Sequence, residues 1–102
     1  MAPPAGSIGS SQKMMSYIGH LIDRYNEYQK AHKDKAGNKK YAMIYIALKR
    51  VFKSDWKHLP TEKFEELASY LQGRIDKTFL GRINKSKGIK NYSTYNEHQL
   101  SP

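Results

Sequence analysis

The chain of 102 residues contains no cysteine, which excludes disulfide bonds, a thiolate zinc site and a cysteine nucleophile. No apolar run approaches the roughly 18 residues that suggest a membrane span, and residues 1 to 11 lack the apolar core of a signal peptide. Acidic residues are scarce, with nine aspartates and glutamates against 18 lysines and arginines. We therefore expect a small, basic, cytoplasmic domain with no membrane contact.

The motifs that carry chemistry are also missing. No glycine-rich phosphate loop, nucleophile elbow or metal motif is present, and no two histidines stand four residues apart beside a carboxylate, as in a helical zinc site. His58 stands between Trp56 and Leu59, where we expect a capping or packing role. The sequence therefore predicts no catalysis, no cofactor and no metal.

Composition divides the chain into three parts. Residues 1 to 11 are rich in proline, glycine, serine and alanine, hold one large apolar residue, Ile8, and are predicted to be a flexible leader. Residues 12 to 84 form the predicted helical domain. Residues 85 to 102 lose the apolar period and predict a basic polar tail, although Tyr92 and Tyr95 are able to fold back. No segment shows the sustained alternation of apolar and polar residues that is typical of a strand. We therefore predict an all-α fold, a compact bundle of three or four short helices with flexible termini.

Apolar residues at steps of three and four predict the helices. The first starts at Gln12, capped by Ser10 or Ser11, and the second spans residues 38 to 52. The third begins near Thr61 as N-cap, and the glutamates in its first turn suit the helix dipole. Gly73 either ends this helix, leaving a short fourth over residues 74 to 84, or is a weak position in one long helix. The predicted apolar stripes are Met14, Met15, Ile18, Leu21, Ile22, Tyr25 and Tyr28; Tyr41, Ile44, Tyr45, Leu48, Val51 and Phe52; and Phe64, Leu67, Ala68, Leu71 and Ile75.

Positive charge is concentrated in residues 38 to 60, which hold six basic residues and one acidic residue of a chain with net charge +9. Like charges three or four residues apart on a helix repel by a few tenths of a kcal/mol, and a bound polyanion relieves that repulsion and releases counterions. This indicates a phosphate-contacting stripe, with a solvated, solubilising face as the alternative. The candidate nucleic-acid contacts are Lys39, Lys40, Lys49, Arg50, Lys53 and Lys57, with Lys85, Lys87 and Lys90 as a mobile supplement.

Other features favour a protein partner. Most of the eight tyrosines fall on helix stripes and are expected to be half-buried with the hydroxyl in water, while one or two can stack on bases or anchor a partner. If the first helix, with Met14, Met15, Ile18 and Ile22, presents more apolar surface than the core covers, the excess forms a dimer interface. The alternative function is thus a protein-interaction module, as a homodimer or as an inhibitor of an acidic protein.

Residues 45 to 71 read YIALKRVFKSDWKHLPTEKFEELASYL, and this segment resembles the small carboxy-terminal domain of bacteriophage antirepressor proteins. Its most specific part is the Leu59-Pro60 step flanked by aromatic residues. The segment between Phe52 and Trp56 is one residue shorter than the family pattern, and Trp56 replaces the commoner tyrosine. The matching positions are Tyr45, Leu48, Lys49, Phe52, Trp56, Lys57, Leu59, Pro60, Phe64, Glu65, Glu66 and Leu71.

This resemblance implies a helical module of a phage or mobile element that acts in regulation through DNA or protein contact in a bacterial host cell. In that family the domain usually follows a longer amino-terminal module. In this sequence almost nothing precedes the matching segment, so we do not carry over to this chain an antirepressor activity that belongs to that module. The leading expectation is a non-enzymatic nucleic-acid-binding module.

Overall fold

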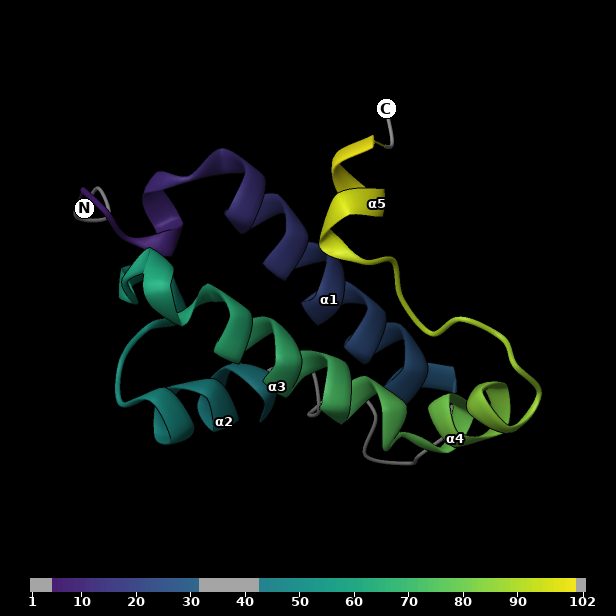
Figure 1. Ribbon diagram of the computed structural model, residues 1–102. Coiled ribbons are helices and arrows are strands. Elements are labelled where there is room, and N and C mark those ends of the chain that lie inside the picture. Colours follow the sequence, from purple (N-terminus) through teal and green to yellow (C-terminus); the bar gives the residue numbers. More distant parts are fainter. Residues whose placement is uncertain (1–4, 32–42, 101–102) are drawn as a thin grey trace.

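The computed structural model describes residues 5 to 31 and 43 to 100. Over these ranges the protein is all-α, which confirms the expected fold class. Figure 1 shows α1 and α3 lying along each other, α2 beside α3, and α4 at the far end of the bundle from the start of α1. The described helices are α1 (Gln12–Ala31), α2 (Met43–Phe52), α3 (Phe64–Asp76), α4 (Phe79–Ser86) and α5 (Tyr95–Leu100), with 3₁₀ turns η1 (Ile8–Ser10), η3 (Trp56–His58) and η4 (Thr61–Lys63).

The core forms where the apolar stripes of α1, α2 and α3 meet. In each of these helices the residues at steps of three and four point to the same side, and even the ten residues of α2 bury two large side chains, Ile44 and Leu48. Ile18 and Ile22 of α1 are buried, and Met14 and Met15 pack against the core, so the stripe is covered within the chain. The fully buried large side chains are Ile8, Tyr17, Ile18, Leu21, Ile22, Ile44, Leu48, Leu67, Leu71 and Ile75.

The start of α1 is as predicted, but the start of α3 is not. The Ser11 hydroxyl accepts a hydrogen bond from the Met14 N–H at 3.3 Å, which satisfies an unpaired donor at the first turn of α1. Thr61 was predicted to cap the third helix, yet it is the first residue of η4, and α3 begins at Phe64. Glu65 and Glu66 do lie in the first turn of α3.

The break between α3 and α4 agrees with neither alternative for Gly73, since the helix does not end at Gly73 and does not continue as one long helix. Gly73 is inside α3, which continues to Asp76, and α4 starts at Phe79. The Thr78 hydroxyl accepts a hydrogen bond from the Gly81 N–H at 3.0 Å and caps α4. A side-chain cap, and no glycine or proline, therefore starts the new helix.

The prediction of a flexible leader is wrong for residues 5 to 11. Ile8 is fully buried, and its N–H donates to the Leu59 carbonyl at 2.7 Å, while the Thr61 N–H donates to the Gly6 carbonyl at 3.1 Å. Ser7 and Pro60 form an antiparallel bridge between these two bonds. One large side chain and two backbone hydrogen bonds are enough to hold this polar segment against the turn before α3.

The prediction of a mobile tail is wrong for residues 85 to 100. Lys85 and Ser86 belong to α4, and Asn91 is buried. The Asn91 side-chain amide donates to the Asp76 carboxylate at 2.8 Å and to the Gly81 carbonyl at 3.1 Å. Tyr92 and Tyr95 fold back onto the core. We call residues 89 to 100 the C-terminal strap.

The tyrosines of α1 do not leave their hydroxyls in water, as the sequence suggested. The Tyr17 hydroxyl donates to the Ser93 carbonyl at 2.8 Å, and the Tyr28 hydroxyl donates to the Asn91 carbonyl at 3.1 Å. Both partners belong to the C-terminal strap. Buried phenols therefore connect α1 to a segment more than sixty residues away along the chain.

Candidate functional site

The predicted phosphate stripe is partly assembled at α2 and the turn that follows it. Lys49, Arg50, Lys53 and Lys57 are all exposed, and none of the acidic residues in the described ranges forms an ion pair with them. Lys53 follows the last residue of α2 with a φ of 62°, in the left-handed region. Lys39 and Lys40 lie outside the described residues.

The lysines at the other end of the sequence do not join this group. Lys85 lies on α4 and Lys87 directly follows it, and Figure 1 shows α4 and α2 at opposite ends of the bundle. Lys90 forms an ion pair with Glu97 inside the C-terminal strap. This pair, with the hydrogen bonds from Thr94, lowers the pKa of Glu97 to about 2. Lys85, Lys87 and Lys90 therefore do not lie together on an extended tail, and their contact with nucleic acid stays a prediction.

Between its cations, α2 presents large apolar side chains to solvent. Met43, Tyr45 and Ile46 are 54%, 49% and 57% exposed. Successive residues of a helix turn by about 100°, so these three alternate with Lys49 and Arg50 around the side opposite Ile44 and Leu48. We call this mixed surface, made by Met43, Tyr45, Ile46, Lys49 and Arg50, the α2 face.

The sequence reading placed Tyr45 and Val51 on the buried stripe of the second helix. Val51 is half exposed like Tyr45, and only Ile44 and Leu48 are buried, with Phe52 packed partly against the core. A helix of ten residues covers a narrow strip of core, and residues at the margins of its apolar arc stay in water. The periodicity located the helix but overstated how much of it is buried.

A cavity of about 210 Å³ adjoins the α2 face, lined by Tyr45, Lys49, Ser54, Asp55 and Trp56. Its floor is fixed, because Trp56 is 7% exposed and the Asp55 carboxylate accepts the Lys57 N–H at 3.1 Å. The Lys57 ammonium lies 5.8 Å from the centre of the Trp56 ring, within cation–π range. The cavity offers an aromatic wall and a cation side by side.

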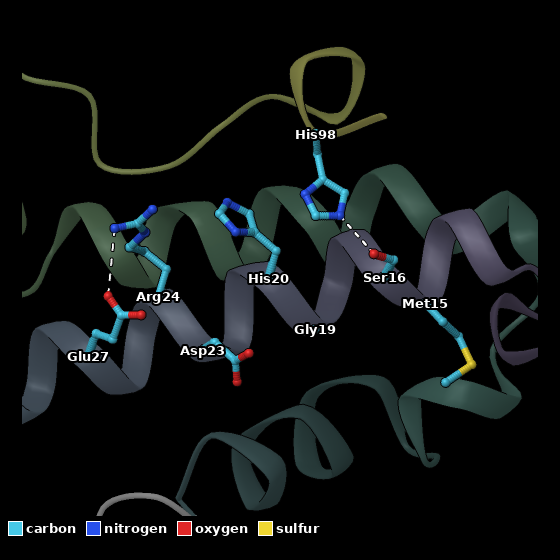
Figure 2. Close-up of a pocket in the computed structure, with 8 residues that line it drawn as sticks. All are labelled: Met15, Ser16, Gly19, His20, Asp23, Arg24, Glu27 and His98. Carbon is cyan, nitrogen blue, oxygen red and sulfur yellow. Dashed lines mark hydrogen bonds and ion pairs between the residues drawn. The ribbon is translucent and has the colours of Figure 1, made fainter. Parts of the chain in front are cut away.

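A second, larger cavity of about 410 Å³ lies elsewhere, along α1. Figure 2 shows His20 and Ser16 rising from α1 and His98 reaching toward them from α5. The two imidazole rings stack with centres 5.1 Å apart, and His98 Nε2 and the Ser16 hydroxyl hydrogen-bond at 2.8 Å. The lining residues are Met15, Ser16, Gly19, His20, Asp23, Arg24, Glu27 and His98.

The electrostatics of this second cavity keep His20 neutral. Burial lowers the pKa of His20, and the neighbouring His98 and Arg24 lower it further, against the carboxylates of Asp23 and Glu27. Arg24 is also held by Glu27 at 3.6 Å. Sequence reasoning missed this site because Ser16 and His98 stand 82 residues apart, and no local spacing signals their meeting.

A capping or packing role was expected for His58, yet its side chain is exposed on η3. Its backbone N–H donates a hydrogen bond to the Asp55 carbonyl. Among the described residues, no group of three or more histidine, aspartate or glutamate side chains is placed to hold a metal ion. Within the same ranges, none of the helices combines the length and apolarity that a membrane crossing requires. Two surface features of the described residues are candidate sites, namely the α2 face with its aromatic cavity and the histidine cavity.

Comparisons of the chain with protein-family models, with curated proteins and with solved structures find no match.

Proposed function

We propose that the protein is a non-enzymatic binding module whose α2 face docks on an acidic surface of another protein. The observation that supports this is the alternation of Met43, Tyr45 and Ile46, each about half exposed, with Lys49 and Arg50. Fully burying such a side chain is worth about 1.5–3 kcal/mol, so covering the exposed half adds roughly 1 kcal/mol for each. A phosphate backbone offers polar oxygens and covers little apolar surface. The apolar residues thus favour a protein, and the cations require it to be acidic.

A second copy of this chain fits the α2 face less well than an acidic partner does. Two copies related by a two-fold axis would place the same surface on both sides of the interface. Lys49 and Arg50 would then face a second Lys49 and Arg50, and like charges across an interface are destabilising. Since residues 45 to 71 resemble a phage antirepressor domain, we place this docking in the regulation of a phage or mobile element.

The test uses a defined probe, a labelled amphipathic helical peptide of glutamate and leucine, and its scrambled counterpart of equal composition. Fluorescence anisotropy at two salt concentrations measures the affinity of each. We expect Ile46→Gln to weaken binding of the amphipathic peptide about fivefold, because about 1 kcal/mol of burial is lost. The double variant Lys49→Glu/Arg50→Glu is expected to weaken it more than tenfold.

Matched controls come from the other end of the bundle. Ile89 is 52% exposed, so Ile89→Gln makes the same chemical change away from the α2 face, and Lys85→Glu/Lys87→Glu repeats the charge reversal near α4. Both controls should bind the peptide as the unaltered protein does. Equal affinity for the scrambled peptide, or an Ile46→Gln variant that binds normally, would contradict docking through the α2 face.

Nucleic-acid binding is the second candidate, and it is supported by the cations of α2 and the following turn, which form no ion pair with a described acidic residue. In this version Lys49, Arg50, Lys53 and Lys57 contact phosphates, and Tyr45 beside Lys49 offers a ring on which a base can stack. For four phosphates the affinity for duplex DNA should fall with a log–log salt slope of about −3.6. The triple variant Lys49→Glu/Arg50→Glu/Lys53→Glu should abolish DNA binding with helicity intact, whereas Ile46→Gln should leave it unchanged.

Measuring duplex and single-stranded DNA beside the peptides separates the two candidates. If Ile46→Gln leaves DNA binding unchanged and the protein shows no preference for the amphipathic peptide, the results would favour a nucleic acid as the partner. Peptide binding that depends on both Ile46 and the cations, with weak DNA binding at moderate salt, would support the acidic protein.

A further inference from the structure

The C-terminal strap is attached to α1 through the histidine cavity. The backbone N–H of Ser93 donates to Nε2 of His20 at 3.3 Å, and the Ser93 carbonyl accepts from the Tyr17 hydroxyl at 2.8 Å. Five residues further on, His98 hydrogen-bonds Ser16 and stacks on His20. Two of the groups that hold the strap are thus imidazoles in contact with each other.

This attachment requires a neutral His20. Nε2 accepts a hydrogen bond from a backbone N–H, which only an unprotonated nitrogen can do. Protonation would place an N–H against an N–H and would also put a positive charge beside the His98 ring, whose centre is 5.1 Å away.

We propose that the C-terminal strap is a pH-sensitive latch, in which proton uptake by His20 releases residues 93 to 100 from α1. On α1, the carboxylates of Asp23 and Glu27 favour protonation of His20 and Arg24 opposes it. From the strap, His98 opposes it.

Three other groups with shifted pKa values at the strap and its docking site do not titrate in the same range. Glu97 stays ionised, because its pKa is about 2. Burial and the nearby Asp76 raise the pKa of Tyr92 to about 12, and burial also raises the pKa of Tyr17 on α1. We therefore assign the pH window of release to His20.

Release changes the surface of the bundle. Tyr95 packs with its ring centre 4.8 Å from Phe64 and 5.4 Å from Tyr17, so undocking α5 uncovers both rings. His98 also forms one wall of the 410 Å³ cavity, as Figure 2 shows. Acid would therefore open that cavity and expose an aromatic patch that the strap covers at neutral pH.

The direction of the effect follows from proton linkage. A released histidine binds its proton near the ordinary pKa of about 6.5, whereas the docked His20 has a lower pKa, so the released state takes up more protons. The ratio of docked to released strap is constant above about pH 7. Below about pH 6.5 it falls by up to tenfold per pH unit for each proton taken up.

The test is nuclear magnetic resonance of the full chain labelled with ¹⁵N, between pH 7.5 and 5.0. We expect the heteronuclear NOE values of amides 93 to 100 to fall from rigid to flexible, with a midpoint that follows the C2–H resonance of His20. Amides of α1 and α3 should stay rigid, which separates release from unfolding. His20→Gln should remove the transition, because a glutamine oxygen accepts the Ser93 N–H without titrating, and the exposed His58→Gln should keep it.

A wild-type strap that stays rigid at pH 5.0 would overturn the latch, as would an unchanged transition in His20→Gln. If His20→Gln leaves the strap released at both pH values, Asp23→Asn decides. A release midpoint moved to lower pH then supports the latch, because the Asp23 carboxylate favours protonation of His20, and an unaltered midpoint overturns it.

Discussion

Lys53 occupies a conformation that glycine adopts more easily. Its φ of 62° ends α2 directly after Phe52, and the left-handed region costs a residue with a Cβ about 1–2 kcal/mol. The extra freedom of glycine in the unfolded chain offsets about 0.5–1 kcal/mol of the relief. We expect Lys53→Gly to raise the free energy of unfolding by about 0.5–1 kcal/mol, measured by chemical denaturation.

The control is Lys57→Gly on η3, where no positive φ is relieved and stability should fall. No gain in Lys53→Gly would contradict strain at this position. Lys53→Gly also removes a cation next to the α2 face, so the affinity of this variant for the acidic amphipathic peptide should drop while its stability rises. Strained backbone conformations cluster at functional sites, and such a trade of stability for affinity is expected if Lys53 is needed for binding.

At the scale of elements, replacing either of two glycines by alanine is expected to change the free energy of unfolding in opposite directions. A Cβ on Gly81 would lie 2.1 Å from the Ile75 carbonyl and 2.8 Å from the Thr78 hydroxyl, whereas a Cβ on Gly73 would meet nothing within 4 Å. Gly81→Ala should therefore lower the free energy of unfolding by at least about 1–3 kcal/mol. Gly73→Ala should raise it by about 0.5–1 kcal/mol, since alanine is the better helix former.

Thermal and chemical denaturation of this pair test the close approach of α4 to the end of α3. A Gly81→Ala variant as stable as the unaltered protein would show that the two helices separate easily. A destabilised Gly73→Ala would show that the space beside α3 is narrower than described.

The helices themselves were largely predictable, because α1 and α3 bury one face and periodicity reports such a face directly. The start of α4 has a local signal in the sequence. Threonine is a favoured N-cap residue, and the Thr78 hydroxyl accepts the N–H of Gly81 three residues later. The exposure of Tyr45 and Val51 was not readable, since it depends on how much of α2 the neighbouring elements cover. The order of the C-terminal strap depends on Tyr17 and Tyr28 finding distant backbone carbonyls, which leaves no local sequence signal.

At the scale of the molecule, the fold separates lysines and arginines that the sequence analysis had grouped as nucleic-acid contacts. The α2 cations and the lysines at α4 lie at opposite ends of the bundle (Figure 1), and no local pattern in the sequence reports that separation. The histidine cavity joins residues from opposite ends of the chain and depends on the whole fold. Clusters of this kind become visible only once the topology is known.

The closing contact of the fold is Ile8 against the rest of the core, and it gives a prediction at the same scale. Ile8→Ala should lower the free energy of unfolding by about 2–4 kcal/mol, because a fully buried side chain leaves a cavity. Ile89→Ala, at a half-exposed position, should change it much less. Chemical denaturation of both variants checks this, and equal small effects would mean that residues 5 to 11 contribute little to the core.

The two flanking segments of the bundle would resist a pulling force differently. Along the C-terminal strap, His98 meets Ser16, then Ser93 meets His20 and Tyr17, then Asn91 meets Tyr28. A force that pulls on residue 100 would therefore break these contacts one after another, and the strap would detach in steps. Tension on residue 5 would load the Gly6–Thr61 bond first, and the next bond along carries Ile8, whose side chain must leave the core before the segment comes free. The bundle is thus mechanically asymmetric. The C-terminal strap detaches stepwise under force, whereas residues 5 to 11 detach only when the Ile8 side chain leaves the core.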